Sequence, residues 1–102
     1  MSGIFRTVGS TTPITVAATT AAVALPAGMN DTDRTVRLAA PADNAGPVFV
    51  AFGVSGVTTA VATGMPILPG TVEVFMPGTN VTHIATIGDA ADTLYVTVGE
   101  GI

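Results

Sequence analysis

The side chains that could carry catalysis are few and widely spaced along the chain. His83 is the single histidine, and the three serines, Ser2, Ser10 and Ser55, fall in predicted turns or near the amino terminus. A serine hydrolase needs a nucleophile beside a base, and a third group that orients the base. His83 lies inside a predicted strand, and no serine occurs in a nucleophile-elbow pattern. The sequence therefore predicts that the protein is not an enzyme.

Acidic residues occur mainly in predicted loops, where they could bind a metal ion. Asp31 and Asp33 follow Asn30 and could begin a calcium loop, but the later ligands, including a bidentate glutamate, are missing. Asp89 and Asp92 are expected to solvate a loop. One histidine and no cysteine disfavour zinc. We expect no metal site, no cofactor and no small-molecule substrate.

The composition disfavours nucleic acid and membrane partners. Charged residues make up 10% of the chain, against about 25% in typical soluble domains. The chain has three arginines, no lysine and a net charge of -4, whereas binding to phosphate backbones needs clustered cations. The longest apolar run, residues 14–25, is too short to span a bilayer. A chain this poor in charge is better explained by subunit contacts than by free solution.

Strand-forming residues dominate, and glycine and proline divide the chain into short segments. Alternation of apolar and polar residues predicts most of the strands. The predicted strands are residues 34–39, 48–52, 71–76, 82–87 and 93–98, with a weaker one at 57–63. Residues 14–25 are predicted to form two short strands or one long bent strand, with a helix as the main alternative.

Turn residues predict how some of these strands connect. Pro69-Gly70 suits a type II turn before residue 71, and Pro77-Gly78 repeats the pattern after residue 76. The five residues 88–92 are predicted to join the last two strands into a hairpin. Residues 48–52 are apolar on both faces, which predicts a central strand or a strand covered by another subunit.

Alternation also predicts which faces the aromatic side chains occupy. In residues 71–76, Val72, Val74 and Met76 alternate with Glu73 and Phe75. Phase alone predicts that Phe75, like Tyr95 in the last strand, is exposed. Two exposed rings would make a weak platform for a carbohydrate.

These patterns together predict an all-β fold: a single antiparallel β-sandwich, jelly-roll-like, of seven or eight short strands. The sandwich domain is expected over residues 13–102, after a flexible amino-terminal arm at residues 1–12. Ile4 and Phe5 place apolar bulk in that arm beside Arg6. We expect the arm to reach onto a neighbouring subunit, with a first strand of the sandwich as the alternative.

Four segments resemble the small virion proteins of tailed bacteriophages found among head genes. These segments are residues 48–53, 65–75, 82–87 and 93–101, and their shared features are strands, a Pro-Gly turn and a glycine-ended terminal strand. The resemblance implies a β-sandwich protein that decorates or cements a capsid, typically as a trimer. It also implies, as a second form, a head spike or tail accessory protein.

The expected function is therefore that of a structural virion protein. The expected partners are other copies in a homotrimer and the major capsid protein, and the expected location is the virion, after assembly in the host cytoplasm. The expected interface residues are Ile4, Phe5, Arg6, Phe49, Phe75 and Tyr95. The alternative is a carbohydrate-binding or host-attachment module of a phage head spike or tail.

Overall fold

A computed structural model describes residues 6–7, 11–25, 34–77 and 81–100 of the chain. These residues form nine strands and no helix. The strands are β1 (Arg6–Thr7), β2 (Thr12–Thr15), β3 (Ala21–Ala24), β4 (Arg34–Ala39), β5 (Val48–Gly53), β6 (Met65–Ile67), β7 (Val72–Phe75), β8 (His83–Ile87) and β9 (Thr93–Glu100). The described part of the chain has no helix long and apolar enough to cross a membrane.

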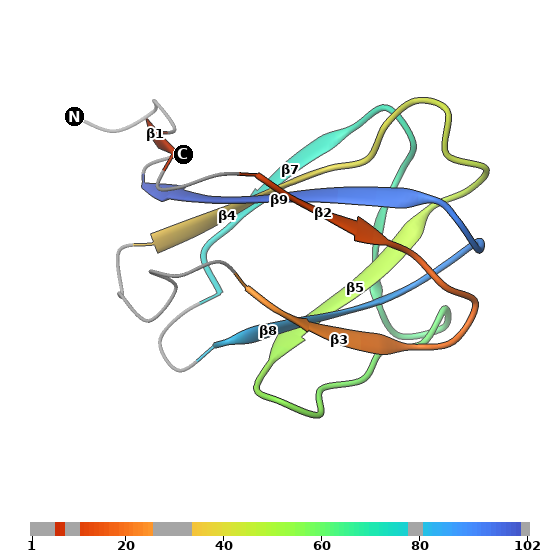
Figure 1. Ribbon diagram of the computed structural model, residues 1–102, viewed down its shortest axis with the longest axis horizontal. Helices are drawn as coiled ribbons and strands as arrows, with labels where there is room; N and C mark the ends of the chain where they lie inside the picture. The colour runs from red at the N-terminus through yellow and green to blue at the C-terminus, as the bar shows by residue number, and fades with distance from the viewer. Residues whose placement is uncertain (1–5, 8–10, 26–33, 78–80, 101–102) are drawn as a thin grey trace.

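The strands form two antiparallel sheets packed face to face (Figure 1). In the first sheet, β1 and β2 both pair with β9, and β4 and β7 follow on the other side of β9. In the second sheet, the order is β3-β8-β5-β6. The pairs β2–β9, β3–β8, β4–β7 and β5–β6 are the nested pairs of a jelly roll. The predicted antiparallel, jelly-roll-like sandwich is confirmed.

Two connections cross between the sheets side by side. The backbone N–H of Val16 donates to the Asp92 carbonyl at 2.8 Å, and that of Ala91 donates to the Val16 carbonyl at 3.0 Å. The N–H of Gly88 donates to the Ala17 carbonyl at 3.0 Å. Residues 88–92 therefore lead from the second sheet to the first. The predicted hairpin of the last two strands is wrong, because β8 and β9 belong to different sheets.

The core lies between the inner faces of the two sheets. Its buried side chains are almost all β-branched or leucine, which suits a pleated surface. They are Ile14, Val16, Val36, Leu38, Ala40, Val48, Val50, Ile67, Ile84, Leu94, Val96 and Val98. Strand β5 lies between β8 and β6, so the prediction of a central strand at residues 48–52 is confirmed.

Two predictions about other segments have different outcomes. Residues 14–25 contain the end of β2 and the whole of β3, so they form two short strands, as predicted, and not a helix. Residues 57–63 were predicted as a strand, and this is wrong, because they belong to the loop between β5 and β6. The loop is held by its own turns, in which the N–H groups of Thr63 and Gly64 both donate to the Ala60 carbonyl.

The predicted Pro69-Gly70 turn is present. Gly70 has a φ of 78°, and the N–H of Thr71 donates to the Leu68 carbonyl at 3.2 Å. This is the type II arrangement, in which the residue after proline needs a positive φ. The turn places β6 and β7 on the same side of the sandwich. Gly78 of the second predicted turn lies outside the described residues.

The amino-terminal segment is described at Arg6, Thr7, Thr11 and Thr12. Arg6 and Thr7 pair with Glu100 and Gly99 at the end of β9. This segment therefore contacts the first sheet of its own chain. Ile4 and Phe5 lie outside the described residues, and so does the side chain of Arg6.

Candidate functional site

Strand β7 presents Val72 to solvent on its outer face. Phe75 pairs with the buried Val36 of β4, and Glu73 pairs with the buried Leu38, so these residues share the inner face. Val72 therefore lies on the outer face, and 46% of its surface is exposed. The chain after β7 continues this exposure, since 57% of the Met76 surface is exposed.

Phe75 lies against the core. Its ring centroid lies 5.6 Å from that of Phe52 in the opposite sheet, with the rings tilted by 59°. The prediction that Phe75 is exposed is wrong. Both faces of β7 carry large apolar side chains, so alternation alone cannot show which face packs against the core. Tyr95 is exposed as predicted, at 41% of its surface.

An apolar row crosses the outer face of the first sheet. Pro13 of β2 pairs with Tyr95 of β9, which pairs with Ala39 of β4, which in turn pairs with Val72 of β7. Residues paired across antiparallel strands lie on the same face. The row therefore joins Tyr95 to the edge strand β7 without an intervening charge.

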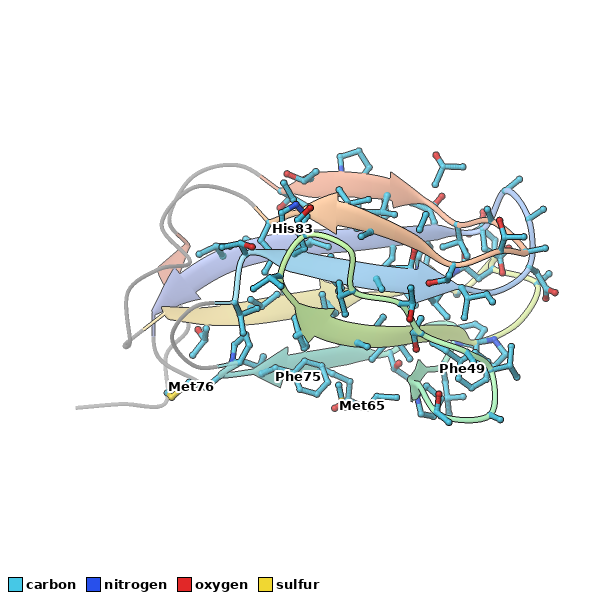
Figure 2. All side chains as sticks on the ribbon, turned by 90° about the horizontal axis from the view of Figure 1, so that it is seen from below. Phe49, Met65, Phe75, Met76 and His83 are labelled. Atoms are coloured by element: carbon cyan, nitrogen blue, oxygen red, sulfur yellow. The ribbon has the colours of Figure 1, made fainter. Side chains whose placement is uncertain are left out.

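Exposed large apolar side chains gather where β6 and β7 form one side of the sandwich. Among the described residues, seven such side chains are strongly exposed: Val54, Val61, Met65, Leu68, Val72, Met76 and Tyr95. Met65 lies in β6, Leu68 in the turn after it, Val72 in β7 and Met76 directly after β7. Val54 and Val61 lie in the β5–β6 loop. Figure 2 shows Met65 and Met76 along this side. We call β6, β7, the turn between them and Met76 the apolar edge.

The apolar edge carries very little charge. No charged residue occurs between Asp43 and Glu73, a segment that includes β5, β6 and both connections that follow them. Glu73 is itself exposed. Contiguous exposed apolar surface usually marks a binding surface. This edge is therefore the best candidate for a functional site in the described residues.

The outer face of the second sheet is covered at β5 and β8 by the β5–β6 loop of the same chain. The N–H of Thr59 in this loop donates to Thr20 Oγ1 at 3.0 Å, beside the start of β3. A Cβ added at Gly64 would lie 2.9 Å from the Phe49 Cβ, so the loop packs closely on β5. In Figure 2 the loop, drawn in light green, passes in front of β8. Phe49 is therefore half-buried beneath its own chain.

His83 has no arrangement suited to nucleophilic catalysis among the described residues. Its Nδ1 lies 2.8 Å from Thr82 Oγ1, in a bond whose donor depends on the tautomer of the ring. Ser55 is exposed in a turn after β5, whereas Ser2 and Ser10 lie outside the described residues. The described residues contain no group of three histidine, cysteine or acidic side chains placed to hold a metal ion.

Asn44 and Asp92 use their polar side chains to hold the fold. Asn44 Nδ2 donates to the Thr93 carbonyl at 2.8 Å, and the Thr93 N–H donates to Asn44 Oδ1 at 3.0 Å. The buried Asp92 carboxylate accepts from the N–H groups of Ala45 and Gly46 at 2.9 and 3.2 Å. These bonds join the β4–β5 loop to the last residue of the crossover and the first residue of β9, at a part-buried position.

The expected interface residues are not gathered in one place. Tyr95 lies on the outer face of the first sheet, Phe75 on its inner face, and Phe49 under the loop of the second sheet. The sequence analysis missed Val72 and Met76 as exposed residues. The long uncharged segment before Glu73 was the signal that could have located the edge.

Comparisons with known proteins bear on the fold alone. No protein-family profile matches the chain, and no curated protein matches it. The solved structure described as "Bacillus endospore appendages form a novel family of disulfide-linked pili" is similar to 100% of this chain and 94% of that chain, with 21% identity and a TM-score of 0.57. The solution structure of a de novo designed double-stranded β-helix is similar to 90% of this chain and 99% of that chain, with 18% identity and a TM-score of 0.47.

Proposed function

We propose that this protein is a structural subunit that works by packing against other protein subunits, and that its specific role is to decorate or cement a bacteriophage capsid. The observation that carries the proposal is the apolar edge, where four of the seven strongly exposed large apolar side chains of the described residues lie. Exposed apolar surface with so little charge is costly for a free monomer and favourable in an interface.

The more specific terms of the proposal come from the resemblance to phage head proteins. They are a homotrimer, a contact with the major capsid protein, a place in the virion and no catalytic role. Obligate subunit interfaces are more apolar than ordinary protein surfaces. A chain with 10% charged residues and an exposed apolar edge suits such an interface.

A second form of the proposal is a subunit of a filament. We consider a filament because the fold is similar, over the whole chain, to a structure whose description says that the appendages form pili. That structure is described as disulfide-linked. The 102 residues here contain no cysteine, so a filament of this chain would need non-covalent contacts.

The carbohydrate-binding alternative is weakened, because only one of the two aromatic rings it requires is exposed. It relied on Phe75 and Tyr95 as an exposed pair, and Phe75 packs against Phe52 in the core. A single exposed tyrosine is a poor platform for a sugar ring, and it is better suited to a protein contact. The observations therefore favour an assembly role.

The test is reconstitution on capsid shells assembled without this protein from the major capsid protein of the same phage. The proposal predicts that the purified chain binds these shells in a fixed ratio and raises their resistance to heating. The same measurement is made on the double variant Val72→Asp, Met76→Asp. This variant places charge on the apolar edge and should abolish binding while the fold remains. A chain that leaves shells bare and forms filaments alone supports the second form. A chain that does neither overturns the proposal.

A further inference from the structure

The four edge strands of the sandwich differ in whether they can accept another strand. The first sheet ends at β7 on one side and at β2, with the two-residue β1, on the other, and the second sheet ends at β3 and β6. Pro13 lies within β2, and Pro66 lies within β6. Proline has no backbone N–H to offer an added strand, and it is a common means of protecting a sheet edge. Strands β3 and β7 contain no proline, so their edges are open.

The two open edges lie at opposite corners of the sandwich. Strands β2 and β3 lie on one side, because the short crossover after β2 connects them. Strands β6 and β7 lie on the other side, joined by the Pro69-Gly70 turn. Each side of the sandwich therefore has one protected edge and one open edge, and the open edges belong to different sheets.

We propose that β7 of one copy pairs with β3 of the next copy, so that the first sheet of one subunit continues into the second sheet of its neighbour. The proposal rests on the proposed assembly function and names the surfaces that join. Strand addition of this kind uses the backbone groups that an edge strand leaves unpaired.

The side chains on the two edges are complementary in size. The outer face of β7 carries Val72 and Val74, whereas the outer face of β3 carries Ala22 and Ala24. Both alanines are exposed. Large side chains beside small ones on one face let neighbouring strands pack without voids.

Charge disfavours the obvious alternative, in which β7 pairs with β7 of a second copy. A pairing centred on this short strand brings the two Glu73 side chains opposite or diagonal to each other on one face, and like charges across strands are destabilising. Strand β3 has no charged residue, so Glu73 meets no carboxylate there.

Pairing of β7 with β3 is head to tail. Such a contact closes into a ring if the rotation between subunits allows it, and otherwise forms a filament. The proposed trimer is the closed form. In either form every interior subunit uses both edges, so blocking either edge should stop growth.

The test uses one lysine on each edge, because an edge lysine disfavours strand addition. The variants are Val74→Lys on β7 and Ala22→Lys on β3, with Val72→Lys as a second β7 variant. The control is Val61→Lys, which places the same charge on a loop residue that is 58% exposed and outside both strands. Native mass spectrometry gives the assembly state, and circular dichroism checks that each variant folds.

We expect each edge variant alone to be monomeric and the control to assemble like the wild type. An equimolar mixture of Val74→Lys and Ala22→Lys should form a heterodimer and nothing larger, because one intact β7 and one intact β3 remain. Assembly of Ala22→Lys like the wild type, with monomeric Val74→Lys, would indicate β7–β7 pairing and overturn the proposal. Assembly of both variants, or a monomeric wild type, would also overturn it.

Binding of the same variants to capsid shells separates this proposal from the proposed function. A wild-type monomer that still binds shells overturns the strand pairing and leaves the decoration role in place. Self-association that depends on both edges, with neither shell binding nor filaments, supports the strand pairing and overturns the proposed function.

Discussion

Phe52 and Phe75 contact each other from opposite sheets, with ring centroids 5.6 Å apart. Both side chains pack against the core cluster. The pair closes the sandwich near the apolar edge, and it orients β7 so that Val72 faces outward. The exposure of Val72 is therefore a consequence of how the core is closed.

The contact predicts a difference between two aromatic residues of the first sheet. Phe75→Ala should lower the free energy of unfolding by about 2 kcal/mol, less than for a fully buried phenylalanine because the ring is half-buried. Tyr95→Ala should cost less than about 1 kcal/mol, because the side chain lies on the outer face and 41% of its surface is exposed. Urea denaturation of both variants measures the difference. Equal costs would show that the rings at 75 and 95 do not occupy different faces.

The Asn44 side chain should stabilise the crossover into β9. Asn44→Ala removes two hydrogen bonds to the Thr93 backbone, and it should cost about 1 to 3 kcal/mol. The neighbouring Asp43→Ala changes an exposed side chain and serves as the control. Thermal unfolding followed by circular dichroism compares them. An Asn44→Ala variant as stable as the control would mean that these bonds do not hold the crossover.

Thr59 should be more stable as valine. Its hydroxyl is buried and has no hydrogen-bond partner among the described residues. Thr59→Val keeps the shape and removes the unsatisfied group, which should raise the free energy of unfolding by about 1 kcal/mol. Thr97→Val should have the opposite sign, since Thr97 Oγ1 shares a 2.7 Å hydrogen bond with Thr11 Oγ1. Loss of stability in Thr59→Val would contradict this account.

Deletion of residues 2–9 separates the two roles expected of the amino-terminal arm. The deletion removes β1, whose two residues pair with the end of β9, but β2 and β4 still flank most of that strand. We expect the fold to persist and the affinity for capsid shells to fall. Thermal unfolding and shell binding are measured together. Unchanged affinity would exclude the arm as an anchor, and a collapsed fold would show that β1 is essential to the sandwich.

The strands could be predicted from sequence because their signals are local. Alternation located β4 and β9, and the Pro69-Gly70 pair predicted a turn that requires positive φ at Gly70. The nested pairing could not be predicted in detail. Residues 88–92 have a length suited to a hairpin, and their crossing depends on distant partners such as Val16.

The candidate site was harder to predict. It depends on which face of each strand points to the core, and on which outer surfaces are covered by loops of the same chain. Phe75 and Val74 are both good core residues, so only the contact with Phe52 decides which faces inward. Phe49 and Ala51 made β5 look like a strand covered by a partner, yet the loop of the same chain covers it. The protection of two edges by Pro13 and Pro66 becomes visible only once the strand order is known.

The central structural claim is that copies of this chain join edge to edge, and sedimentation equilibrium of the purified wild-type chain tests it most directly. The account predicts a mass of three times the 10.1 kDa chain at micromolar concentration, and a return to the chain mass when Val74→Lys is introduced. A wild-type protein that sediments as a monomer at these concentrations, without aggregation, would contradict it.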